Sequence, residues 1–147
     1  MSKVEKAVKC FKDGGSCSMA IFSTYGPGLG VDEKTALRIS SAFGGGMARM
    51  GETCGAVTGA FMVIGLLNHT KPGDTKEMVK EKIYACVHDF VDEFKSRNKS
   101  IKCKDLLSCD LSTPEGKKIL KEKKLLDTVC VKFVRDSAEI IEKILNK

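Results

Sequence analysis

Cysteines are the residues of this 147-residue chain best suited to chemistry, and there are seven of them: Cys10, Cys17, Cys54, Cys86, Cys103, Cys109 and Cys130. The number is odd, the first residues carry no apolar secretion signal, and 42% of the chain is hydrophobic, enough for a core. A framework of structural disulfides is therefore not expected. Because thiolates are nucleophiles and ligands for soft metals, the cysteines indicate metal binding or redox chemistry.

The strongest local signal is the glycine-rich segment from Gly44 to Gly59, which leads to Cys54 at the predicted start of an apolar helix. Free backbone N–H groups and the positive end of a helix dipole stabilise a thiolate there and lower its pKa. Cys17 follows Gly14-Gly15-Ser16 at the start of another predicted helix and should gain the same benefit. Cys130 also lies just inside a predicted helix boundary. Such positions suit metal ligation or nucleophilic attack.

Other ligand chemistry finds less support. Gly44-Gly45-Gly46 follows a predicted helix and lacks the strand and the Gly-Lys-Ser/Thr ending of a phosphate-binding loop. His69 and His88 are isolated, so both are interpreted as surface or core residues. Glu52, two residues before Cys54, is the only candidate general base near that thiol, so whether the protein is an enzyme stays open.

Helical periodicity and capping residues predict the elements that must position these cysteines. Glycines or prolines separate them, nothing is typical of a strand, and a single all-α domain over 1–147, a bundle of about six to seven helices, is expected. An Asp74–Glu77 capping box should open the longest helix. The predicted helices begin near Val4, Ser16, Asp32, Cys54, Asp74, Thr113 and Asp127, and a short segment holds Cys103 to Cys109.

Gly51, Gly55 and Gly59 are spaced four apart, which places them on one face of the apolar helix and lets another helix pack closely. An exposed face of this kind could also support a homodimer. The apolar run from Cys54 to Leu67 is shorter than the ~20 residues that span a bilayer. It is interpreted as a buried core helix, and no membrane association is expected.

The formal charge of +6 comes from 25 basic residues interspersed with 19 acidic ones. Such mixing is typical of a solvated surface, so nucleic-acid binding is not expected. The N-terminal residues have charges through their apolar positions, which predicts a cytoplasmic protein.

The sequence resembles a family of redox-active proteins named for its cysteine pattern: a cysteine, a glycine-cysteine-alanine motif with a later glycine, and two more cysteines. The central motif reads Cys54-Gly55-Ala56-Val57-Thr58-Gly59 here, in the order Cys-Gly-Ala. The other cysteines of the pattern match Cys17, Cys103 and Cys130, and the likeness extends through nearly the whole chain. The resemblance implies that these four cysteines form the site, and it suggests a redox or iron–sulfur role. Cys10, Cys86 and Cys109 are then interpreted as packing residues.

Three functions remain open. The first is an iron–sulfur protein, with a [2Fe–2S] cluster on Cys17, Cys54, Cys103 and Cys130, which transfers or senses electrons with a partner protein. The second is a metal-free thiol–disulfide protein in which Cys54 is the catalytic nucleophile and another of the four resolves the mixed disulfide. The third is a structural zinc or metal-trafficking module. No C-x-x-C pair occurs, so each ligand would have to come from a separate element.

Overall fold

The computed structural model describes residues 1–147, and all of its regular elements are helical. The all-α prediction is therefore confirmed, with two single-turn elements, α4 and α7, beside the longer helices. None of the helices has the length and apolar composition needed to cross a bilayer. The elements are α1 (Lys3–Lys12), α2 (Cys17–Tyr25), the 3-10 turn η1 (Pro27–Leu29), α3 (Glu33–Ser40), α4 (Gly44–Met47), α5 (Gly55–Leu67), α6 (Lys76–Asn98), α7 (Cys103–Leu107), α8 (Pro114–Glu122), the π-helical turn η2 (Leu126–Cys130) and α9 (Val131–Leu145).

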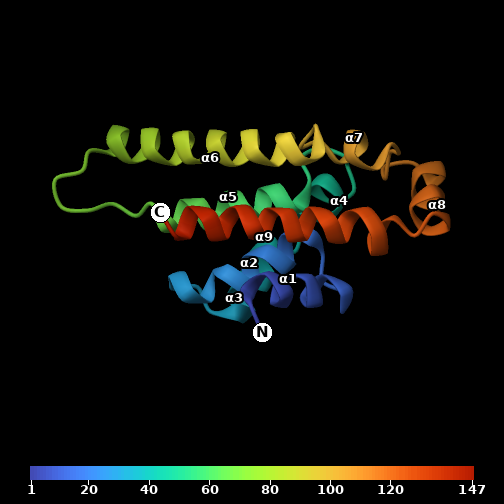
Figure 1. Ribbon diagram of the computed structural model, residues 1–147, viewed down its shortest axis with the longest axis horizontal. Helices are drawn as coiled ribbons and strands as arrows, with labels where there is room; N and C mark the ends of the chain where they lie inside the picture. Colours follow the sequence, from blue (N-terminus) through green and yellow to red (C-terminus); the bar gives the residue numbers. More distant parts are fainter.

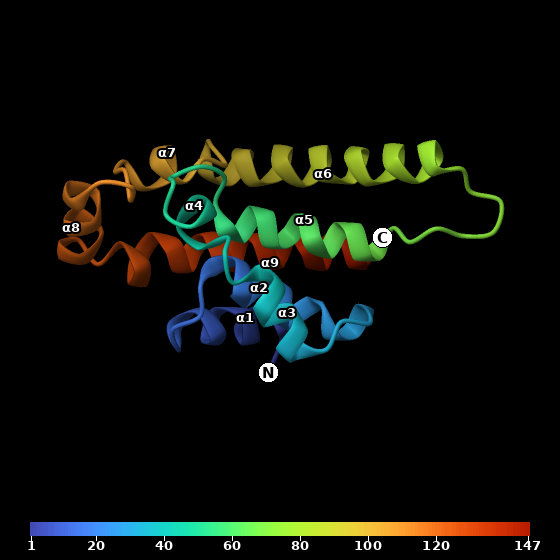
Figure 2. The ribbon, with the colours of Figure 1, turned by 180° about the vertical axis from the view of Figure 1, so that it is seen from behind.

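The helices form three layers (Figure 1). The long helix α6 lies on one side, α5 and α9 form the middle layer, and α1, α2 and α3 lie on the other side. Seen from behind, α4 and α7 lie close to the start of α5, at the end of the molecule opposite the loop that joins α5 to α6 (Figure 2). That end also holds α8 and the start of α9.

Helix α5 forms the centre of the core, as predicted from its apolar composition. Ala56, Val57, Ala60 and Val63 are all fully buried, and each buried valine contributes on the order of 1.5–3 kcal/mol. The hydroxyl of Ser137 in α9 donates a buried hydrogen bond of 2.7 Å to the carbonyl oxygen of Ala56. This bond fixes α9 against the first turn of α5.

Two glycines bring α2 and α5 close together. A Cβ atom on Gly59 would lie 3.0 Å from Cβ of Ile21, and one on Gly55 would lie 3.1 Å from Cβ of Cys17. The predicted close packing is confirmed for this pair, but the placement of Gly51 on the same helix face is wrong. Gly51 lies in the preceding loop with φ +72°, because α5 begins only at Gly55. The glycine face is covered by α2 of the same chain and is not free to form a dimer.

Helix starts follow their predicted caps with one exception. The side chain of Ser16 accepts a hydrogen bond from the N–H of Met19, as an N-cap should. The predicted Asp74 cap is wrong: α6 is capped by Thr75, whose hydroxyl accepts from the N–H of Met78 at 3.1 Å. The Asp74 carboxylate instead accepts from the N–H of Lys71 and closes the preceding turn.

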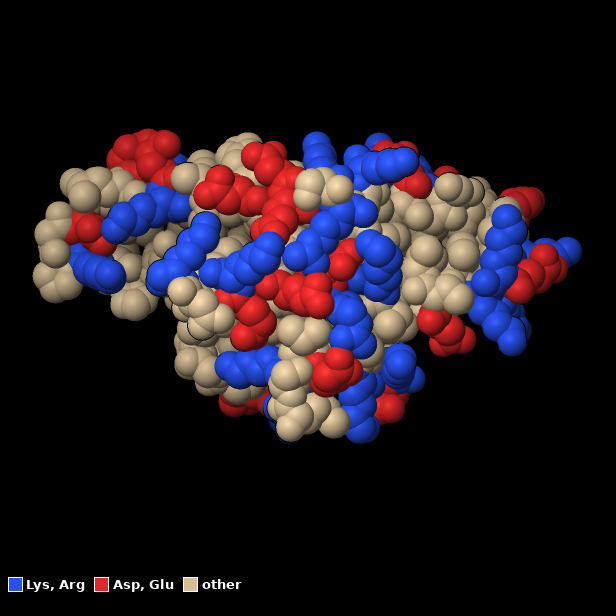
Figure 3. Space-filling view, viewed as in Figure 1, with Lys and Arg blue, Asp and Glu red and all other residues tan.

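The surface charges are mixed, as the sequence predicts. Figure 3 shows acidic and basic side chains interleaved over the face that carries α6 and α9. Several of them are paired, including Arg97 with Asp136 at 3.3 Å and with Glu139 at 2.7 Å.

Candidate functional site

Four cysteines from four separate segments line one small cavity. Cys17 is the first residue of α2, Cys54 precedes α5, Cys103 begins α7, and Cys130 ends η2. The cavity has a volume of about 40 Å³. Each cysteine is at most 9% exposed and carries a free thiol. These are the four cysteines selected in the sequence, so the fold brings all of them together. The other lining residues are glycines and apolar side chains: Gly45, Gly46, Gly55, Leu106, Leu107, Leu111, Leu126 and Phe133.

A short backbone pairing joins the segments that carry Cys54 and Cys103. Thr53 and Lys102 form an isolated antiparallel bridge. On either side of it, the N–H of Cys54 donates to the carbonyl oxygen of Ile101 at 2.8 Å, and the N–H of Cys103 donates to that of Glu52 at 2.6 Å. Sequence reasoning missed this pairing because one residue pair gives no strand-length pattern.

A left-handed turn positions the loop before Cys54. Five successive residues, Gly45 to Arg49, have φ values between +54° and +71°, a conformation that costs non-glycine residues roughly 1–2 kcal/mol each. Gly46 lies so close to Cys103 that an added Cβ would be 2.6 Å from the Cβ of that cysteine. An added Cβ on Gly44 would be equally close to Cβ of Ser16. The turn therefore packs between the starts of α2 and α7.

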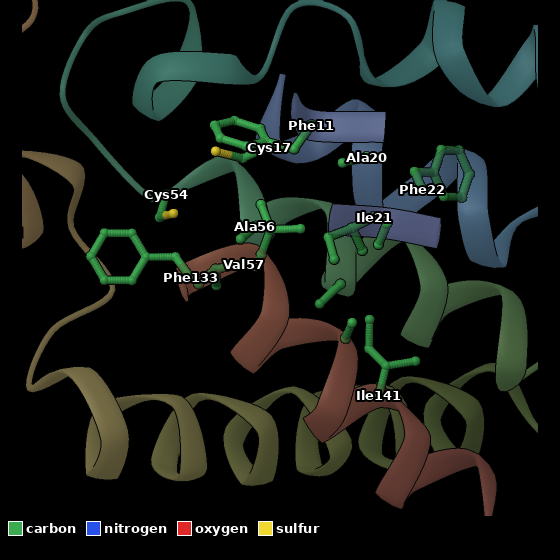
Figure 4. Close-up of a cluster of buried hydrophobic side chains, with 14 of the residues drawn as sticks. Phe11, Cys17, Ala20, Ile21, Phe22, Cys54, Ala56, Val57, Phe133 and Ile141 are labelled. Carbon is green, nitrogen blue, oxygen red and sulfur yellow. The ribbon is translucent and has the colours of Figure 1, made fainter. Parts of the chain in front are cut away.

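Cys54 is the thiol best suited to ionise. Figure 4 shows its sulfur and that of Cys17 turned toward the same space, with Phe133 beside Cys54. A hydrogen bond from the Cys17 thiol lowers the pKa of Cys54; burial opposes this, and the backbone N–H groups of Ala56 and Val57 add to the lowering. The direction agrees with the activation predicted for this helix start.

The same activation was expected for Cys17, and there the expectation is wrong. Its hydrogen bonds with Cys130 and then Cys54, followed by burial, raise the pKa of Cys17 well above the usual range. Burial likewise raises the pKa of Cys103 to about 12, with the neighbouring Cys54 as the next cause. The lowered pKa of Cys54 thus lies beside the raised pKa values of Cys17 and Cys103.

Cys130 reaches the cavity in an unexpected way. No helix begins there, because the π-helical turn Leu126–Cys130 runs directly into α9. π-Helical turns are rare and are often found at functional sites. Cys103, for which no helix start was predicted, is the first residue of α7 instead.

The remaining candidates lie outside the cavity lining. Cys10, Cys86 and Cys109 are half-buried, and Cys109 is near enough to Cys130 for that thiol to contribute to its raised pKa, after the larger effect of burial. His69 and His88 are exposed. Glu52, two residues before Cys54, forms ion pairs of 3.9 Å with Lys102 and Lys104.

The donor set fits an iron–sulfur cluster in kind and number, since such clusters take four cysteine thiolates. Backbone N–H groups reach the sulfur of Cys54, and the cavity lining around the thiols is made of glycines and apolar side chains. As they stand, no three Cys, His, Asp or Glu side chains gather around one point closely enough to hold a single metal ion.

Comparison with curated proteins and with solved structures gives no match. One protein family, described as "Putative redox-active protein (C_GCAxxG_C_C)", matches residues 16–144. This range covers most of the chain and includes all four cysteines of the cavity. The chain therefore belongs to this redox-active family.

Proposed function

We propose that Cys17, Cys54, Cys103 and Cys130 hold a [2Fe–2S] cluster and that the protein transfers or senses electrons. The proposal rests on one observation: four thiols from four distant segments line the same buried, mostly apolar cavity. A cluster needs four thiolates, whereas a thiol–disulfide pair needs only two. When bound, the cluster would supply one-electron redox chemistry.

The residues around the thiols would set the properties of such a centre. The N–H groups of Ala56 and Val57 reach the sulfur of Cys54, and hydrogen bonds to ligand sulfurs tune the reduction potential. Leu111 and Phe133 line the cavity and would place apolar side chains against the cluster. A zinc ion is less well supported, because a single ion requires its ligands around one point, whereas two irons spread four thiolates over a wider space.

The experiment is metal and sulfide analysis with an absorption spectrum, on protein purified without oxygen and without added metal. Iron, sulfide and visible charge-transfer bands are expected. Cys54→Ser should reduce the iron content at least tenfold. Cys86→Ser, the control, should retain the iron and lose at most about 1 kcal/mol of stability because Cys86 lies outside the cavity. Equal effects of the two substitutions, or zinc with a featureless spectrum, would contradict the proposal.

A second candidate is metal-free thiol–disulfide exchange, favoured by the lowered pKa of Cys54 next to a protonated Cys17. The Cys54 thiolate would attack a disulfide, forming a mixed disulfide and releasing one thiolate. The Cys17 thiol would give its proton to the thiolate released in the first step and then attack the sulfur of Cys54, releasing the second thiolate, which takes a proton from the buffer, and leaving a Cys17–Cys54 disulfide. Absence of iron together with reversible pairing of these two cysteines would favour this candidate.

For either chemistry we propose a redox partner protein and a cytoplasmic location, where reducing conditions keep free thiols reduced.

A further inference from the structure

A second, larger cavity adjoins the one that holds the thiols. It has a volume of about 560 Å³, which is in the range of small-molecule binding sites, roughly 300–1,000 Å³. The two cavities share Cys17, Gly45, Leu111 and Leu126 in their linings. We call the larger one the outer cleft. Cys17 is the only one of the four site cysteines that lines it, so a molecule in the outer cleft meets that thiol first.

The outer cleft has an apolar side and a charged side. Phe11, Leu120 and Leu126 contribute the apolar surface, and Leu126 is 48% exposed. The cationic side chains are Lys12 and Arg49, and neither forms an ion pair within the protein. Two cations without a partner, beside an apolar surface, are complementary to an amphipathic anion.

The backbone holds Arg49 in place. It is the last residue of the left-handed turn, with φ +64°, and its N–H donates to the carbonyl oxygen of Gly44 at 3.1 Å. Non-glycine residues in this conformation are strained, and such strain is concentrated at functional sites. Asp127 lines the cleft as well and also lacks an ion pair, which leaves a place for a ligand group that donates hydrogen bonds.

We propose that the outer cleft binds a small amphipathic carboxylate, with the carboxylate against Lys12 and Arg49 and the apolar body against the leucines. Its other end then lies next to Cys17. That this molecule is a reactant of the redox centre rests on the proposed function; its binding does not.

Alkylation of the reduced, metal-free full chain tests the binding. Iodoacetate and iodoacetamide carry out the same reaction, in which the thiolate sulfur bonds to the CH₂ carbon, iodide leaves and the thiol proton passes to the buffer. Only iodoacetate carries a carboxylate. Mass spectrometry of proteolytic fragments gives the rates at Cys17 and at Cys86, which is half-buried and lies outside the cleft.

The iodoacetate-to-iodoacetamide rate ratio at Cys17 should exceed that at Cys86 by about tenfold at low salt. In the double variant Lys12→Gln, Arg49→Gln it should fall to the Cys86 value. The control Lys71→Gln, Lys76→Gln makes the same change in net charge outside the cleft and should retain the preference.

The reaction is followed at alkaline pH, because the raised pKa of Cys17 leaves little thiolate at neutral pH. Equal ratios at the two cysteines, or an unchanged ratio in the Lys12, Arg49 variant, would each overturn the proposal. Failure of the proposed function has a different signature, absence of iron and sulfide from the anaerobic protein. The two results are read separately, because the alkylation uses protein without metal.

Discussion

Substituting Gly46 by alanine tests how the left-handed turn positions Cys103. The residue has φ +70°, and an added Cβ would lie 2.6 Å from Cβ of Cys103, 2.7 Å from the backbone nitrogen of Glu52 and 2.8 Å from its oxygen. The backbone of Glu52 cannot move freely, because its N–H donates to the carbonyl of Gly46 and its oxygen accepts from the N–H of Cys103.

Two costs add in this variant. The left-handed conformation costs alanine roughly 1–2 kcal/mol, and overpacking costs about 1–3 kcal/mol more. Gly46→Ala should therefore lower the free energy of unfolding by about 2–5 kcal/mol. The matched control is Gly73→Ala, with φ +90° and no atom within 4 Å of the added Cβ. It should show only the conformational cost.

Urea unfolding followed by circular dichroism measures both variants, and iron content per chain reports the site. Gly46→Ala should also lose iron, because displacement of Cys103 removes one proposed ligand, while Gly73→Ala should retain it. If Gly46→Ala costs no more stability than Gly73→Ala, then close contact with Cys103 does not require a glycine at position 46, and the reasoning is wrong.

Three further predictions concern stability. Burial raises the pKa of Tyr25, as does its 2.7 Å hydrogen bond to Glu142. Above pH 10 only the unfolded state therefore loses this proton, and the free energy of unfolding should fall by about 1.4 kcal/mol per pH unit because of this group. In urea unfolding between pH 9 and 11, Tyr25→Phe should show a shallower decline than the unchanged protein. Asp136→Ala removes hydrogen bonds to three side chains and should cost about 2–3 kcal/mol, a loss that thermal unfolding in 0.5 M salt should still show because Asp136 is only 8% exposed. In α5, Gly59→Ala should lower the free energy of unfolding by about 1–3 kcal/mol. Gly65→Ala, whose Cβ meets open space, should raise it by up to about 1 kcal/mol. If urea unfolding gives the same sign for both variants, the packing described for α2 and α5 is contradicted.

Local chemistry made most of the helices predictable. Apolar periodicity and capping residues depend on neighbours a few positions away, so the caps Ser16, Asp32 and Thr113 are where the sequence places them. The Asp74 prediction failed for a local reason too. Thr75, the next residue, is also a good cap, and the choice between them depends on the turn before the helix.

The site was less predictable because its contacts are not local. The choice of cysteines could be made from the motif around Cys54, but their convergence depends on a bridge between Thr53 and Lys102 that has no sequence signature. The four-residue spacing of Gly51, Gly55 and Gly59 suggested a continuous helix face, and the left-handed turn interrupts it. The pKa of Cys17 depends on Cys54 and Cys130, which come from other segments.

The origin of the four thiols in four segments has a consequence for biosynthesis. Cys17 lies near the beginning of the chain, and Cys130 ends the turn that leads into the last helix. During translation the cavity cannot close until α9 has packed against α5, where Ser137 bonds to Ala56. Loading of the proposed cluster would then follow synthesis of α9, and a bound cluster would stabilise only the fold in which α9 is packed. Under the proposed function, the iron content would therefore distinguish chains in which α9 is packed from fragments that lack it.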